Sequence, residues 1–481
     1  MAIVRIPLYL ENQERSASSG KGPRMLNCFP EILSNKEKDN AEANNYIMVK
    51  RPGIVLHDDV TAGASTARGM WTFNGVLFSI FGNTVYKDGV ALATTMDDAT
   101  GRCYFDDMGG SVPRLCIQDA DNGLLYITNA ASTDIVKQTD AQIPTSMAAG
   151  VVVLDGFILI ADTNGSIFNS NTAGGFTGDQ SAWAADNFVV SEVLPDDITA
   201  LRRHSNYAVA FNERSIEFFF NNGDATGSPF NRLDGTTNLM GCPAGASPVN
   251  CDDEMVFVGQ SWTGGRSVNL MKGFTHKRVS TQIIEEYLDA EKDNIANAHA
   301  MYIRTMGHRF YLLTLPTTAD TTLVYDLDED VWHEWTSGDL VSKFVGMYAA
   351  IDVGKVLVQH ATDGKIYELD PAIYQDIGAA INLRFQTKQT DGEVNQAKFC
   401  SRLELIGDRE TTSANVSISW SDNDYTTYNT ARTVDISSVR RTLLRLGAFE
   451  RRSFLVDYTG NTPFRMEGLE LNVRRGHYGQ T

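Results

Sequence analysis

The chain has 481 residues, of which 41 are Lys or Arg and 60 are Asp or Glu, so its formal net charge is −19 at pH 7. Hydrophobic residues make up 42% and charged residues 21%, which is close to the globular average and excludes a wholly disordered chain. The acidity argues against a sequence-specific DNA-binding protein, because such proteins neutralise phosphates with a basic face. It also argues against attachment to an anionic membrane.

Residues 1–60 contain few apolar runs and many Asn, Glu, Lys and Pro residues. This composition predicts an extended N-terminal arm that lies on another surface rather than a domain with its own core. Arg5 interrupts the first apolar stretch and no small-residue cleavage site follows it, so we expect no signal peptide. No apolar run of the chain is long enough to span a bilayer, and we expect no membrane insertion.

Between residues 61 and 372 one pattern recurs seven times: a short apolar strand, a turn of Gly, Asn or Asp, and a second strand. The repeats are 39 to 54 residues apart and begin at Gly75, Arg114, Phe157, Tyr207, Met255, Arg309 and Lys355. This spacing is typical of a β-propeller blade. We therefore predict an all-β protein with a β-propeller of about seven divergent blades over residues 61–372. A β-sandwich with irregular spacing is the alternative.

Two features within this region depart from the repeated hairpin. Residues 280–288, STQIIEEYL, begin with a capping residue and have apolar side chains at helical spacing, which predicts a helix packed between two blades. Residues 326–330, DLDED, have the alternating acids of a calcium loop. They lack the glycine expected at the sixth position and the acid expected at the twelfth, so we interpret them as an acidic hairpin turn.

The sequence shows few patterns that are typical of catalytic or metal-binding sites. Its eight histidines are dispersed, and its six cysteines form no CxxC pair and are too sparse for a disulfide framework. We predict no catalytic residues, no cofactor and no metal site, and we expect the protein not to be an enzyme. The cysteine usage favours synthesis in a reducing cytosol.

Residues 373–481 follow a boundary at Asp370-Pro371 and contain alternating strands that predict one β-sandwich. Residues 381–481 carry 14 Lys or Arg against 12 Asp or Glu, whereas the rest of the chain carries 27 against 48. The acidity therefore belongs to the arm and the propeller.

Arginine accounts for 12 of the 14 basic residues in the C-terminal region, and arginine favours interfaces because its planar fork pairs bidentately with carboxylates. The alternative is a solvated face with salt bridges inside the sandwich. The candidate assembly interface consists of Arg440, Arg441, Arg445, Arg451, Arg452, Arg474 and Arg475.

Several short sequence motifs follow one another along the chain in an order that resembles one protein family. They include RPGI at 51–54, SIEFF at 215–219, ST with IIE at 280–285, VYD at 324–326 and S-D-x5-Y at 421–428. Over about 430 residues this order resembles the tail-hub proteins of short-tailed bacteriophages. These proteins are also called tail accessory factors, nozzles or packaged-DNA stabilisation proteins.

The resemblance implies a structural virion protein, made in the host cytoplasm, that assembles as a six-fold ring below the portal and its adaptor ring. Such a ring extends the DNA channel, helps retain the packaged genome and docks tailspikes or fibres and a needle or plug. Double-stranded DNA would pass through its lumen without sequence-specific binding. No catalytic residues come with this family.

Acidic walls repel the DNA backbone, so we expect part of the surplus negative charge to line the lumen of the ring. Two other functions remain open. One is a carbohydrate-binding or glycan-cleaving propeller, which would need aromatic stacking and paired carboxylates. The other is a receptor-binding fibre, which would be trimeric.

Overall fold

The computed structural model describes residues 2–6, 8, 23–32, 46–172, 177–391 and 396–475. Within these ranges the protein consists of strands, one α-helix, α1 (Gln282–Ala290), and one short 3-10 helix (Ile295–Asn297). No helix in the described part of the chain is long and apolar enough to cross a membrane. The predicted all-β class is confirmed.

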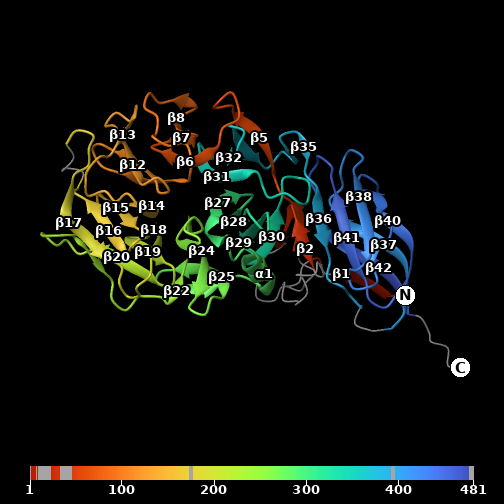
Figure 1. The fold of residues 1–481 in the computed structure, drawn as a ribbon. Helices are drawn as coiled ribbons and strands as arrows, with labels where there is room; N and C mark the ends of the chain where they lie inside the picture. Colours follow the sequence, from red (N-terminus) through yellow and green to blue (C-terminus); the bar gives the residue numbers. More distant parts are fainter. Residues whose placement is uncertain are drawn as a thin grey trace.

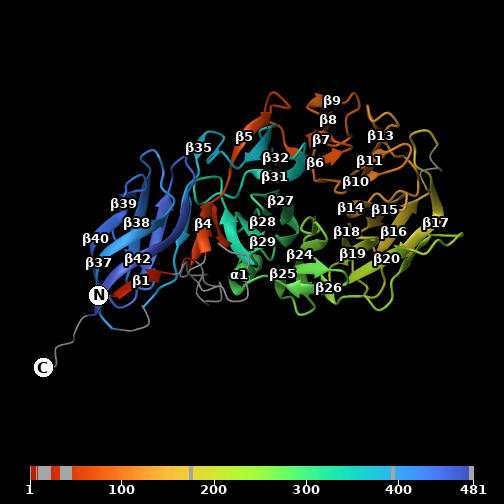
Figure 2. The same ribbon diagram turned by 180° about the vertical axis from the view of Figure 1, so that it is seen from behind.

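Four blades occupy the first half of the ring in Figures 1 and 2. Blade one contains β6 (Ala67–Phe73), β7 (Val76–Phe81), β8 (Thr84–Lys87) and β9 (Val90–Ala91). Blade two contains β10 (Cys103–Met108), β11 (Arg114–Asp119), β12 (Leu124–Thr128) and β13 (Ile135–Lys137). Blade three contains β14 (Met147–Leu154), β15 (Phe157–Asp162), β16 (Ser166–Ser170) and β17 (Trp183–Val190). Blade four contains β18 (Ile198–His204), β19 (Tyr207–Asn212), β20 (Ile216–Asn221) and β21 (Phe230–Arg232).

Three further blades complete the ring. Blade five has its inner strand split into β22 (Met240–Gly241) and β23 (Val249–Cys251), followed by β24 (Glu254–Ser261), β25 (Arg266–Lys272) and β26 (Thr275–Arg278). Blade six contains β27 (His299–Thr305), β28 (His308–Leu315), β29 (Thr321–Asp326) and β30 (Val331–Trp335). Blade seven contains β31 (Gly346–Asp352), β32 (Lys355–His360), β33 (Ile366–Asp370) and β5 (Gly53–Asp58). Counted over the described residues, seven blades confirm the prediction.

The ring is closed by the N-terminal part of the chain. β5 is the outermost strand of blade seven and pairs antiparallel with β33, so that Gly53 lies opposite Asp370. On its other side β5 pairs parallel with β34 (Gln375–Asp376), which pairs in turn with β35 (Ala379–Ala380). A Cβ on Gly53 would lie 2.2 Å from the Gln375 carbonyl oxygen, so this close approach requires glycine.

The structure also shows the two segments that depart from the repeated hairpin, the predicted helix and the acidic turn. Helix α1 lies between blades five and six and buries Ile284 and Leu288 in the core that these blades share, which confirms the predicted helix. Thr281 occupies the N-cap position, but its hydroxyl makes no capping hydrogen bond. The acidic segment 327–330 joins β29 to β30, so its interpretation as a hairpin turn is confirmed.

The C-terminal strands form two further sheets beside the propeller (Figure 1). One contains β3 (Cys28–Ile32), β4 (Tyr46–Lys50), β42 (Arg465–Arg475), β37 (Lys398–Gly407) and β40 (Thr442–Phe449), with β1 (Ala2–Ile6) paired to β42. The other contains β2 (Arg24–Leu26), β36 (Leu383–Gln386), β41 (Ser453–Tyr458), β38 (Asn415–Ser421) and β39 (Arg432–Asp435). Both sheets contribute to one hydrophobic core, for example Leu403 and Leu471 from the first and Ile418 and Val456 from the second.

The N-terminal segment is distributed over three sheets. β1, β3 and β4 extend one C-terminal sheet, β2 links the other to β30 of blade six, and β5 completes blade seven. The described strands of this segment are therefore integrated into sheets of their own chain. Domain limits at residues 60 and 372 remain a prediction.

A buried cation holds this junction together. Arg51 is fully buried and donates to Asp376 with Nη1–Oδ1 and Nη2–Oδ2 distances of 3.1 and 2.5 Å. Its Nε donates to the Asn27 side-chain oxygen at 2.8 Å, and Nη2 donates to the Thr336 carbonyl at 2.7 Å. The guanidinium also lies 5.3 Å from the centre of the Phe344 ring. One side chain thus connects the N-terminal segment, the loop after blade six and the segment that leads to the C-terminal sheets.

The neighbouring Lys50 makes stability depend on pH. Its ammonium group is buried and donates to the carbonyls of Gly460 and Tyr374 at 2.8 and 3.2 Å. Burial lowers the pKa of Lys50 to about 7, whereas the unfolded chain holds this proton up to about pH 10.5. Since the unfolded state binds more protons between these values, the free energy of unfolding should rise with pH across this window.

We therefore expect the unaltered protein to gain about 2 kcal/mol relative to Lys50→Met between pH 7 and pH 9. Urea unfolding of both proteins at each pH measures this difference, and the other titrating groups cancel in the comparison. Lys355→Met, at a half-exposed lysine paired with Glu368, is the control and should show no such trend. A difference that does not change with pH would contradict the expectation.

Candidate assembly interface

The sheet formed by β1, β42, β37 and β40 has one buried and one open face. Leu403, Leu443 and Leu471 lie opposite one another across the strands and point into the core. The next side chain along each strand points outward, because successive side chains of a β-strand point to opposite faces of the sheet. The outward row consists of Ile3, Asn472, Arg402 and Leu444, which are direct cross-strand partners.

Large apolar side chains are exposed on this open face. Ile3 is 73% exposed, Leu444 55% and Phe399 54%, and Phe399 lies directly opposite Arg474. We call this set, Ile3, Phe399, Arg402, Leu444 and Arg474, the apolar–arginine face. Exposed apolar residues beside arginines are typical of protein–protein interfaces, where arginine and aromatic residues are enriched.

The seven predicted arginines are separated by the structure. Arg474 belongs to the apolar–arginine face, and the exposed Arg445 follows Leu444 in β40 with a φ of 59°. Arg475 is exposed opposite Lys398. Arg440 and Arg441 precede β40, and Arg441 donates to the carbonyls of Gly407 and Asp408 at 2.5 and 2.8 Å.

Arg451 and Arg452 follow β40 at its other end, and their contacts lie within the chain. Arg452 is 1% exposed, donates to both oxygens of Asp422 at 2.6 and 2.7 Å, and lies 4.3 Å from the Phe449 ring centre. Its guanidinium therefore connects the segment between β40 and β41 to the residues that follow β38, and it is buried within the chain. Arg451 pairs with Asp424 at 3.2 Å on the surface. The alternative of internal salt bridges applies to Arg452, and an interface at the exposed arginines remains a proposal.

Sequence reasoning missed the apolar members of this face. Leu443 and Leu444 are adjacent, so their strand shows no alternation that would tell which one points outward. Ile3 joins the face only because β1 pairs with β42, more than 460 positions away. The one sequence signal for this face is that Phe399 stands beside a basic residue in a strand.

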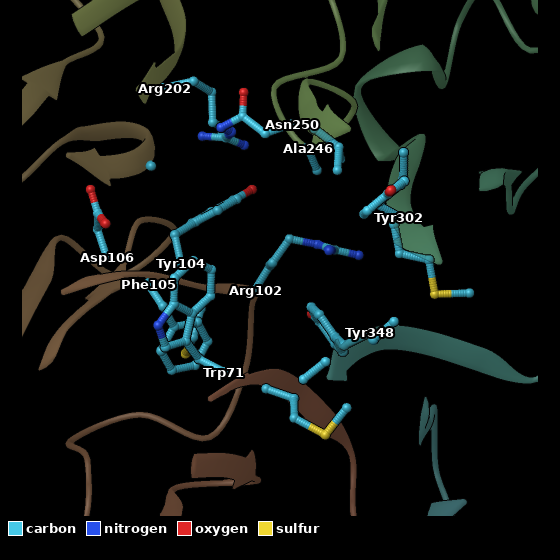
Figure 3. Close-up of a pocket in the computed structure, with 18 of the residues that line it drawn as sticks. Trp71, Arg102, Tyr104, Phe105, Asp106, Arg202, Ala246, Asn250, Tyr302 and Tyr348 are labelled. Carbon is cyan, nitrogen blue, oxygen red and sulfur yellow. The ribbon is translucent and has the colours of Figure 1, made fainter. Parts of the chain in front are cut away.

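The axis of the propeller contains a cavity of about 520 Å³ (Figure 3). The inner strands of all seven blades line it, and its walls include Trp71, Tyr104, Phe105 and Tyr348. Asp106 is the single carboxylate among its described lining residues. The described residues that line this cavity therefore do not form the pair of carboxylates that most glycosidases place across a sugar.

The comparison with protein families bears on the propeller. A family model described as "Bacteriophage P22 Gp10, beta-propeller" matches residues 23–374. The chain belongs to this phage stabilisation family. It is accordingly a structural protein of a phage tail and a component of the virion. The match includes β2 to β5 and all seven blades, and it ends before β34, so the apolar–arginine face lies entirely outside it.

Several solved structures match the chain at low sequence identity. Virginiamycin B lyase from Staphylococcus aureus is 11% identical, with a TM-score of 0.39, over 67% of this chain and 98% of the lyase. YCF48 from Cyanidioschyzon merolae is 10% identical, with a TM-score of 0.38, over 64% of this chain and 96% of its own. Exo-β-1,3-galactanase from Phanerochaete chrysosporium is 10% identical, with a TM-score of 0.27, over 76% of this chain and 95% of the galactanase. These similarities say nothing about activity. No curated protein matches the chain.

Proposed function

We propose that this phage stabilisation protein is a tail hub, or nozzle, of a short-tailed phage. In this role six copies form a ring below the portal and its adaptor ring, extend the DNA channel and help to retain the packaged genome. The ring also carries docking surfaces for tailspikes or fibres and for a needle or plug. The observation that carries the proposal is the family match across the whole propeller.

Two physical features support this role. The apolar–arginine face offers exposed apolar area beside cations, which suits contact between copies or with the adaptor ring. The charge surplus lies on residues 1–380, with 48 acidic against 27 basic residues, and repels the DNA backbone. A lumen lined by such residues would let DNA pass without holding it.

We expect the double variant Phe399→Glu/Leu444→Glu to weaken ring assembly at least about tenfold, since each change places a charge in a desolvated apolar contact. Mass photometry and electron microscopy, with and without the adaptor protein, measure the assembled fraction. Val353→Glu is the matched control, because Val353 is 87% exposed on a hairpin of blade seven.

The same images test the wider proposal. Six-fold rings support a hub, whereas trimers would indicate a receptor-binding fibre. A ring whose lumen is neutral or basic would contradict the acidic-channel hypothesis. Unchanged assembly of the double variant would show that the interface lies elsewhere, and Arg440→Glu/Arg441→Glu then tests the arginines before β40.

A further inference from the structure

Three arginines line the axial cavity, and two of them, Arg202 and Arg102, differ in their surroundings. Arg202 donates to four carbonyls around the axis, those of Ala149, Leu201, Gly245 and Pro248, at 2.5 to 3.0 Å. Its hydrogen-bonding capacity is largely used in joining blades three, four and five. Arg202 is thus part of the wall of the cavity.

Arg102 has no such partners. No described residue accepts a hydrogen bond from its guanidinium, and its Nη2 is buried and unpaired. The group lies 4.3 Å from the centre of the Tyr348 ring, and Figure 3 shows it between Tyr104 and Tyr348. A cation held over an aromatic ring keeps its in-plane donors available. A buried unpaired donor is costly, so an acceptor that reached Arg102 would be stabilising.

No carboxylate among the described lining residues pairs with this guanidinium. The Asp106 carboxylate accepts hydrogen bonds from the backbone N–H groups of Val153 and Asp107 at 2.7 and 2.9 Å. Burial raises the pKa of Asp106 to about 6, so its charge is weakened in mildly acidic solution. With Arg102, Arg202 and Arg203 against Asp106, the lining is cationic within a strongly acidic protein.

The cavity is also accessible and of useful size. Arg203, Asn250 and Ile351 line it and are exposed to solvent, which places an opening at the ends of β18, β23 and β31. Binding pockets for small molecules have volumes of about 300–1,000 Å³, are mostly apolar and contain a few directed polar groups. The aromatic walls and the single unpaired guanidinium fit that description.

We propose that the axial cavity binds a small molecule of about monosaccharide size that carries an oxyanion group, with Arg102 pairing to that oxyanion and the aromatic walls packing against its body. A carboxylate and a phosphate present the same paired oxygens to a guanidinium. This binding site is separate from the assembly role and does not depend on it.

Isothermal titration of the full-length protein with glucuronate, glucose 6-phosphate and glucose tests the proposal, with inorganic phosphate as a fourth probe. At least one anionic sugar should bind about tenfold or more tightly than glucose, because only the anions can pair with Arg102. Arg102→Met should remove that preference. Arg304→Met, at an exposed arginine of β27, should keep it.

The outcomes separate clearly. A preference for glucuronate assigns a carboxylate ligand, and a preference for glucose 6-phosphate or phosphate assigns a phosphate ligand. Equal binding of glucose and both anionic sugars, or a preference for anionic sugars that survives in Arg102→Met, overturns the proposal. If Arg102→Met does not fold, a structure of the unaltered protein with the tightest ligand decides: density against Arg102 supports the site, and density elsewhere or none overturns it.

Discussion

Replacement of Arg51 by Met should lower the free energy of unfolding by about 3–5 kcal/mol, which is typical when one partner of a buried ion pair is removed. The Asp376 carboxylate would remain 6% exposed without its cation, and the oxygens of Asn27 and Thr336 would each lose the hydrogen bond that Arg51 donates. All of these groups lie where the N-terminal segment crosses from the C-terminal sheets to the propeller. The loss should therefore reduce the stability of both parts.

Urea unfolding followed by tryptophan fluorescence measures the effect, since Trp335 lies 5.6 Å from the Arg51 guanidinium. The double variant Arg51→Met/Asp376→Leu should recover part of the loss because it removes the orphaned carboxylate as well. Arg304→Met is the control: Arg304 and its partner Asp252 are 61% and 42% exposed, and their pair should contribute about 0–1 kcal/mol. A loss at Arg51 no larger than that at Arg304 would contradict the prediction.

Removal of residues 1–58 should prevent stable folding of the propeller. Without β5, the edge of β33 is unpaired and blade seven cannot cover Tyr367 and Leu369, which are buried against Ile54 in one core cluster. An open ring with an exposed strand edge is prone to aggregation. We expect the truncated chain to lose its cooperative thermal transition and to elute as aggregates.

A chain that lacks only residues 1–22 provides the comparison, because it keeps β2 to β5 and loses β1 alone among the described strands. Its propeller should still unfold cooperatively. Calorimetry and size-exclusion chromatography distinguish the two chains. If the chain starting at residue 59 shows the same transition, the ring closes without β5.

The sequence was most informative where structure is local. Hairpins at near-constant spacing predicted the blades, and the apolar spacing of Ile284 and Leu288 predicted α1, because both patterns are set by residues within a few positions of one another. The closing strand could not be predicted in this way. The segment GIVLHD at 53–58 pairs with residues more than 300 positions away, and no local signal specifies that partner.

The roles of individual arginines depend on tertiary contacts. Arg451 and Arg452 are adjacent in sequence, yet one is on the surface and the other is buried, because only Arg452 reaches Asp422 and the Phe449 ring. In the sequence, Arg51 stands out only as the first residue of RPGI, one of the motifs that carry the family resemblance. Its burial follows from three segments that converge on it from distant positions. Composition indicates that arginines are numerous but not where each one points.

Because β1 pairs with β42, the propeller can close earlier during synthesis than the sheet that contains β1 can be completed. β5 can close the ring as soon as residue 370 has left the ribosome, but Ile3 has no neighbour until residues 469–473 have been synthesised. Domains of a nascent chain generally fold as units during synthesis, from the N-terminal end. Here β1 must wait for β42. The apolar–arginine face is therefore completed only after β42 has been synthesised, so a nascent chain that stops before β42 cannot dock through this face onto finished copies.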